Sequence, residues 1–213
     1  MKIEISADEI RTLAEIKKIA ECKELHATET RTGGFIEIGD FVVPKAEIDG
    51  VEFDTLHVTG ARLVIVDQNE NRKIAMFDHV LFDSVISANT DDAESAETFA
   101  DTALGTYLNG PFLKAILEQT EIKPKKVSLV TEFEMFGTGC KESNFDENPK
   151  RFDFFKQGIN RIRFNSDEDY SRWYWLGGKI EGSTTSFCLC NGVGGANNGV
   201  AAYSLAVPPA LMI

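Results

Sequence analysis

The spacing of hydrophobic residues changes near residue 30. Over residues 6–25, apolar side chains recur every three or four positions with Lys and Glu between them, which is typical of an amphipathic helix. Ser6 and Glu9 have the spacing of a capping box, in which each side chain satisfies a free backbone amide of the other. We therefore predict a helical segment over residues 1–30 and one domain over residues 31–213. This helix packs on its own domain or, alternatively, joins copies of the chain.

The next part of the chain alternates short apolar runs with turn residues, a pattern of antiparallel strands. A polar turn at residues 67–71 predicts a hairpin over residues 63–78. The acidic stretch 91–97 has few apolar residues and is expected to be a solvated loop. The predicted strands are residues 35–38, 41–43, 51–53, 56–58, 62–66 and 73–77.

The middle of the chain predicts helices and one strand. Residues 98–119 have a helical pattern that Asn109-Gly110-Pro111 interrupts, so two helices broken at this point are expected. A strand is predicted over residues 125–130, and single helical turns over 131–136 and 151–156. Six phenylalanines between positions 133 and 155 are expected to pack under long loops. The closing run 205–213 is too apolar for a frayed end and is expected to join the sheet.

Charge and composition narrow the classes of function. The 34 acidic residues outnumber the 22 basic ones, and a net charge of −12 repels phosphate backbones, so nucleic acid is not an expected partner. No run of about 18 apolar residues and no secretory leader pattern are visible, which predicts no membrane insertion and a cytoplasmic site of synthesis. With 43% hydrophobic residues, the chain can bury a core without a disulfide or metal staple.

The cysteines and histidines give little indication of a metal site or a catalytic site. Cys188 and Cys190 are one residue apart, but a structural zinc site needs four ligands, so we interpret them as small buried thiols on one strand face. Their use by an oxidoreductase is the alternative. The three histidines lack metal-ligand spacing, and no nucleophile elbow, phosphate loop or zinc-binding helix is present. The expectation is a protein that is not an enzyme and that uses no cofactor and no metal.

The segment from Trp173 to Tyr203 has the composition of a binding surface. Tyr and Trp give large contact area at low entropic cost, while Ser, Gly and Asn adapt their hydrogen bonds. Seven of the 17 glycines lie between positions 177 and 199. The alternative is that the glycines only turn corners and that Trp175 belongs to the core. The candidate ligand-binding residues are Tyr174, Lys179, Glu181, Asn191, Asn197, Asn198 and Tyr203.

Several stretches of the chain form an ordered set of motifs. They are Trp173-Tyr174-Trp175-Leu176, the run 186–190, a Gly and Asn loop and the closing run 205–213, with residues 102–112 and 127–134 upstream. Together they resemble a domain family of unknown function from gut bacteria and their phages. The similarity covers residues 35–213. That family is similar to the C-type-lectin-like fold, which also occurs in the variable proteins of diversity-generating retroelements. The resemblance implies an α+β, C-type-lectin-like fold with short antiparallel strands, two or three helices and long loops.

The resemblance also implies a function. In those variable proteins the C-terminal sequence forms an exposed binding surface on a fixed scaffold. The motifs of calcium-dependent lectins, Glu-Pro-Asn and Trp-Asn-Asp, are absent, and Gly177-Gly178 replaces the usual Arg-Ser. The expectation is a non-catalytic ligand-binding or receptor-binding protein of phage origin, with an unknown protein or glycan ligand, that forms homo-oligomers or associates with a virion. The alternative is a structural phage or assembly protein whose loops form subunit contacts.

Overall fold

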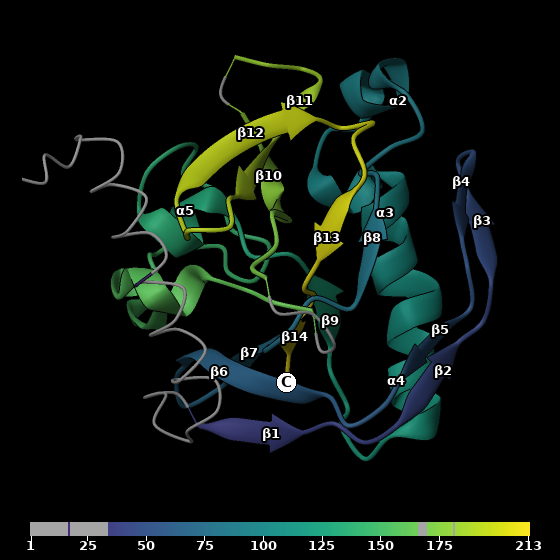
Figure 1. Cartoon of the computed structure of the whole chain (residues 1–213), viewed down its shortest axis with the longest axis vertical. Coiled ribbons are helices and arrows are strands. Elements are labelled where there is room, and N and C mark those ends of the chain that lie inside the picture. Colours follow the sequence, from purple (N-terminus) through teal and green to yellow (C-terminus); the bar gives the residue numbers. More distant parts are fainter. Residues whose placement is uncertain (1–16, 18–33, 166–169, 181) are drawn as a thin grey trace, which may run out of the picture.

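The computed structural model describes residues 17, 34–165, 170–180 and 182–213. The predicted N-terminal helix therefore lies outside the described residues, apart from Lys17. The described chain has an α+β fold built from mostly antiparallel sheets and a few helices (Figure 1).

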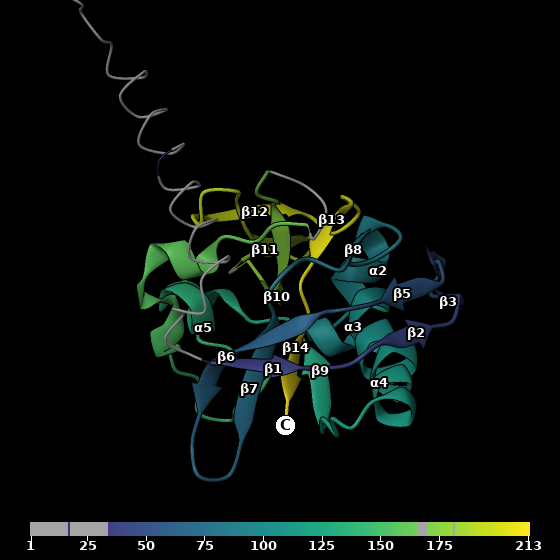
Figure 2. The ribbon, with the colours of Figure 1, turned by 60° about the horizontal axis from the view of Figure 1, so that its bottom comes forward.

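The first sheet contains the predicted hairpin and the C-terminus. Its five strands are antiparallel in the order β1-β6-β7-β14-β9. The hairpin β6–β7 is confirmed, and its turn is closed by Asn69, whose Oδ1 accepts hydrogen bonds from the amides of Asn71 (2.9 Å) and Arg72 (3.0 Å). It projects from the body of the molecule in Figure 2. The strands are β1 (Phe35–Glu37), β6 (Arg62–Gln68), β7 (Lys73–Phe77), β14 (Ala210–Met212) and β9 (Lys126–Ser128).

The second sheet is formed mainly by the C-terminal part of the chain. Its order is β12-β11-β10-β13-β8, and all pairs are antiparallel except β10 with β13. Strand β8 was not predicted from the sequence. Apolar clusters cover both faces of β10, with Trp175 in one and Tyr174 in the other. The strands are β8 (Phe82–Ser84), β10 (Tyr174–Lys179), β11 (Ser186–Cys190), β12 (Ala196–Val200) and β13 (Leu205–Val207).

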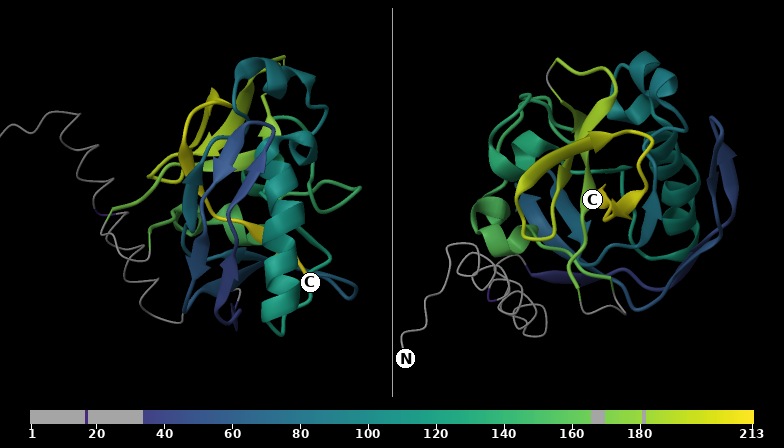
Figure 3. Two further views of the ribbon diagram at one scale, coloured as in Figure 1. Left: turned by 90° about the vertical axis from the view of Figure 1, so that its right-hand side faces the viewer. Right: turned by 45° about the horizontal axis from the view of Figure 1, so that its top comes forward.

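Two small ribbons lie beside the main helix, which consists of α3 (Ala103–Tyr107), η2 (Leu108–Phe112) and α4 (Leu113–Gln119) (Figure 3, left). One pairs β2 (Phe41–Val43) with β5 (Leu56–Val58), and the other pairs β3 (Ala46–Ile48) with β4 (Val51–Phe53). Strand β3 was not predicted, although Asp49-Gly50 is a strong hairpin signal. Both turn residues have positive φ, 49° and 75°, as a two-residue type I′ turn requires.

The main helix contradicts the predicted break at Asn109-Gly110-Pro111. The segments α3 (Ala103–Tyr107), η2 (Leu108–Phe112) and α4 (Leu113–Gln119) follow one another as one helix with a π turn in the middle. In an α-helix the ring of Pro111 would meet the carbonyl four residues earlier, and the wider π turn relieves this clash. Asn109 Nδ2 also donates to the Gly105 carbonyl (3.2 Å), so the helix continues through the proline.

A short helix also replaces the predicted acidic loop. Helix α2 (Thr90–Ser95) occupies most of residues 91–97, so that prediction was wrong. The apolar residues Ala93 and Ala96 are 0% and 5% exposed, and their burial favours an ordered turn over a solvated loop. The remaining helical turns are η1 (Phe99–Asp101), α5 (Glu132–Phe136), η3 (Asp153–Lys156) and η4 (Gly158–Arg161).

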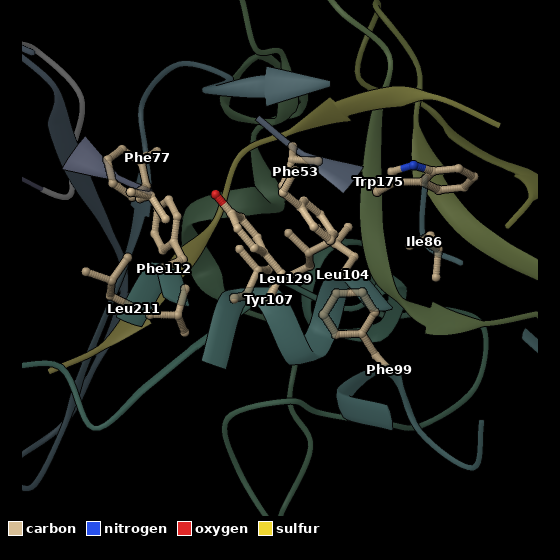
Figure 4. Close-up of a cluster of buried hydrophobic side chains, with 14 of the residues drawn as sticks. Phe53, Phe77, Ile86, Phe99, Leu104, Tyr107, Phe112, Leu129, Trp175 and Leu211 are labelled. Carbon is tan, nitrogen blue, oxygen red and sulfur yellow. The ribbon is translucent and has the colours of Figure 1, made fainter. Parts of the chain in front are cut away.

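The larger core cluster lies between the main helix and the sheets (Figure 4). Phe53 from a ribbon stacks on Tyr107 of the helix with ring centroids 4.0 Å apart, and Phe77 meets Phe112 edge to face at 6.1 Å. A second cluster on the other side of the sheets contains Phe145, Phe152, Phe154 and Phe155. The prediction that the phenylalanines pack under long loops is therefore confirmed for these four.

Helix α5 begins with a capping box that buries a carboxyl group. The Thr131 hydroxyl accepts from the Glu134 amide (3.2 Å), and Glu134 Oε2 accepts from the Thr131 amide (2.8 Å). Ser143 donates to the other carboxyl oxygen. Glu134 is 0% exposed. Burial raises the pKa of Glu134 to about 7, although the hydrogen bonds from Ser143 and Thr131 act in the opposite direction.

This buried carboxyl group makes stability depend on pH. The folded protein keeps the Glu134 proton up to about pH 7, whereas the unfolded chain loses it near the ordinary value of 4.5. The stabilisation is thus complete below pH 4.5 and is lost as pH rises through 7. For the wild type, we expect denaturant melts to show that the free energy of unfolding falls by up to about 3 kcal/mol between pH 5 and 8. The Glu134→Gln variant should not show this decrease. The exposed Glu147→Gln variant should keep the wild-type slope, and an unchanged slope in Glu134→Gln would contradict the prediction.

Candidate functional site

The end of the chain is an interior part of both sheets, as predicted. Strand β14 lies between β7 and β9, and β13 lies between β10 and β8. The backbone of Ile213 exchanges two hydrogen bonds with Lys73 (2.8 and 3.0 Å). The segment from Trp173 onward therefore contains both structural strands and exposed positions, which only the three-dimensional arrangement separates.

Strand β12 is the edge of the second sheet, and its first three residues are exposed. Asn197 and Asn198 lie here, and the strand crosses the front of the molecule in the right-hand view of Figure 3. Gly199 holds the strand against the core, because a Cβ atom there would lie 3.2 Å from both Trp175 Cη2 and Leu189 Cδ2. The edge strand thus rests directly on the buried tryptophan.

The turn that leads into β12 is held by its own side chain. Asn191 Oδ1 accepts from the amides of Val193 (3.1 Å) and Gly195 (2.8 Å). Gly194 has φ of 76°, and a Cβ atom there would come within 2.8 Å of the Gly158 carbonyl. Only glycine suits that position. This glycine-rich turn therefore has a defined shape rather than a free one.

Exposed aromatic residues flank β12 at both of its ends. Trp173 is 48% exposed, and its Cδ1 is 3.6 Å from the Cβ position of Gly192 in the turn before the strand. Tyr203 is 60% exposed in the turn after the strand, where its amide donates to the Val200 carbonyl (2.9 Å). We call Trp173, Asn197, Asn198 and Tyr203 the β12 surface.

The structure separates the seven predicted site residues. Asn197, Asn198 and Tyr203 belong to the β12 surface, and Glu181 lies outside the described residues. Tyr174 is a correction, because it is 0% exposed and its hydroxyl donates to the Arg161 carbonyl. A tyrosine on an interior strand with both faces covered cannot meet a ligand.

The other two predicted residues have structural contacts. Lys179 is partly buried, donates to the Ala96 carbonyl and lies 6.0 Å from the Phe187 ring centroid. The side-chain oxygen of Asn191, Oδ1, is used to close the turn before β12. Trp173 was missed, because in Trp173-Tyr174-Trp175 the composition does not tell which aromatic residue is exposed. Trp173 is the exposed one because it lies just before the first residue of β10, outside the buried strand.

The cysteine prediction is confirmed for the described positions. Cys188 and Cys190 are buried on the same face of β11, and within the described residues neither forms a disulfide. The Cys188 thiol donates to Glu132 Oε2 (3.2 Å), and burial together with this carboxylate raises its pKa well above the ordinary value. Within the described residues, no group of three or more His, Cys, Asp or Glu could hold a metal ion.

A cleft of about 420 Å³ brings together two histidines that are separate in the sequence. His57 and His79 line it with Arg62, which lies 3.3 Å from the carboxylate of the fully buried Asp78. The turns after β5 and β7 create this arrangement, so spacing along the chain could not reveal it. Its lining residues do not include any of the β12 surface.

Comparison with known proteins found no matching protein-family model, no matching curated protein and no matching solved structure. Among the described helices, none has the length and apolar composition that a bilayer crossing requires.

Proposed function

We propose that the protein is a non-catalytic ligand-binding or receptor-binding protein of phage origin, with a C-type-lectin-like fold, whose binding site is the β12 surface. The observation that carries this proposal is the pair of exposed aromatic side chains at the two ends of an exposed edge strand. Trp173 and Tyr203 are 48% and 60% exposed, although large aromatic groups are usually buried in a core of this kind. The strand between them exposes two consecutive asparagines, whose side chains point to opposite faces of the strand.

The rigidity of the platform supports the proposal. Trp175 and Leu189 lie under Gly199, and the side chain of Asn191 closes the preceding turn. A surface that is ordered before binding loses less conformational entropy on association. Aromatic groups for contact area and asparagines for hydrogen bonds suit a protein or glycan ligand.

Alanine substitutions on this surface test the proposal. We expect Trp173→Ala, Asn197→Ala, Asn198→Ala and Tyr203→Ala each to weaken binding to the protein's target in a screen of a glycan array and of intact bacterial cells. The asparagine and tyrosine variants should change the free energy of unfolding by no more than about 0.5 kcal/mol, because exposed side chains carry little stability. Binding and thermal melting are measured on the same samples.

The control is Leu117→Ala, which truncates another exposed apolar side chain, 38% exposed, on helix α4. It should retain full binding. If the four β12 variants bind as the wild type does but change the sedimentation coefficient, the surface is a subunit contact and the assembly alternative holds. If they unfold the protein, these residues are structural and the proposal fails.

A further inference from the structure

A short basic segment stands out in this acidic chain. Between Lys150 and Arg163 there are five basic residues and one acidic residue, Asp153, whereas acidic residues exceed basic ones by 34 to 22 in the whole chain. Two arginines of this segment, Arg151 and Arg161, come from either side of η3. Neither belongs to the β12 surface.

The fold brings these two side chains to the same end of helix α5. The Arg161 Cζ atom lies 4.8 Å from the ring centroid of Phe136, the last residue of the helix. The Arg151 Cδ atom lies 3.0 Å from the Cβ position of the next residue, Gly137. Burial first, and then the charge of Arg151, lower the pKa of Arg161, so the two guanidinium groups repel each other.

No carboxylate balances this pair. Within the described residues, neither arginine has an acidic partner at ion-pair distance, whereas Arg62, Arg72 and Arg172 each have one. The Nε atoms of Arg151 and Arg161 are both buried without a hydrogen-bond partner. The one hydrogen bond from the Arg151 guanidinium is a long one, 3.4 Å, to the Phe155 carbonyl. Two adjacent cations with unused buried donors are costly unless an anion binds them.

A route from solvent exists to Arg151. Arg151 lines a cleft of about 570 Å³ between β6 and the segment around η3. The two carboxylates of that cleft are already paired: Asp67 with Lys150 (2.9 Å) and Arg72 (3.1 Å), and Asp153 with Lys156 (2.7 Å). Paired carboxylates repel an incoming anion less than free ones, and the charge of Arg151 is left uncompensated.

We propose that Arg151 and Arg161 form a binding site for an oxyanion, a carboxylate or a phosphate group, at the C-terminal end of helix α5. The guanidinium fork matches two oxygens of either group, and the aromatic face of Phe136 orients the Arg161 fork. The site shares no residue with the β12 surface, although the Arg161 Cβ atom lies 3.3 Å from the Cβ position of Gly194 in the turn before β12. It does not depend on the function proposed for that surface.

Isothermal titration with sodium phosphate and, separately, with sodium acetate tests the site, with sodium chloride as the reference salt. We expect saturable binding of at least one oxyanion, weakened about tenfold or more in Arg151→Gln and in Arg161→Gln, because hydrogen bonds to charged groups are lost. Comparison of the phosphate and acetate titrations shows which oxyanion the site prefers. Lys156→Gln removes an exposed, already paired charge from the same segment and should change the affinity less than about twofold.

Several results would overturn the proposal. They are no saturable binding in either arm, chloride binding of equal strength, or an equal loss of affinity in Lys156→Gln, which would indicate only the general field of the segment. Circular dichroism and thermal melting establish that each variant is folded. If Arg161→Gln does not fold, Arg161→Lys replaces it: the charge is kept but the planar fork is lost, so binding should still weaken, and unchanged binding in that variant would contradict the proposed fork.

Discussion

Replacing Trp175 by alanine is expected to destabilise the protein by about 3–5 kcal/mol, the usual cost of a large cavity in a core. Trp175 is 0% exposed and belongs to the larger core cluster, and its Nε1 donates to the Ser84 carbonyl (3.0 Å). The substitution also removes the support under Gly199, so the edge strand β12 should lose its fixed position. Guanidinium denaturation measures the first effect, and the binding screen measures the second.

A matched control lies two residues earlier. Trp173→Ala truncates the same side chain at a position that is 48% exposed, and the free energy of unfolding should fall by no more than about 1 kcal/mol. Binding should nevertheless be weakened in both variants: Trp173→Ala removes a contact group, and Trp175→Ala removes the support under β12. Equal destabilisation by the two substitutions would show that the assignment of one tryptophan to the core and the other to the surface is wrong.

Deleting residues 210–213 is expected to abolish the cooperative melt. This deletion removes β14, which is paired on both edges, and leaves β9 without its partner in the sheet. Leu211 is 0% exposed, and the loss of one such leucine alone costs about 2–5 kcal/mol, a large part of the stability of an average domain. Thermal melting, near-ultraviolet circular dichroism and size exclusion should show an aggregating or molten chain.

Point variants in the same strand separate packing from chain length. Leu211→Gln places an amide in the larger core cluster and should be strongly destabilising. Met212→Gln changes the neighbouring, partly exposed residue on the other face and should cost much less. A truncated protein with an unchanged cooperative melt would show that β14 is dispensable.

The elements that the sequence predicted well depend on interactions between residues close in the chain. The β6–β7 hairpin follows from alternating apolar residues around a polar turn, and Asn69 closes that turn with its own side chain. The burial of Cys188 and Cys190 follows from their alternation on one strand. The inclusion of the C-terminus in the sheet follows from its apolar composition alone, because such a run is costly to leave in water.

Other features depend on groups that are distant in the sequence. The helix continues through Pro111 because a π turn makes room for the proline and packing of the flanking turns holds it, which the local pattern of Asn109-Gly110-Pro111 does not show. Tyr174 lies in a segment whose composition is typical of a binding surface. However, β10 lies inside the sheet with apolar clusters on both faces, so tertiary packing buries the ring.

The β12 surface and the Arg151–Arg161 pair also depend on groups that are distant in the sequence. The amino-acid sequence determined that the Trp173 to Tyr203 segment carries aromatic and asparagine side chains, and that the segment around Arg151 and Arg161 is basic. Only the tertiary structure made β12 an edge strand with an exposed aromatic residue at each end, and only it brought the two arginines to one end of α5. The physical reason is that the exposure and the charge environment of a side chain depend on what packs beside it, and those neighbours come from distant parts of the chain.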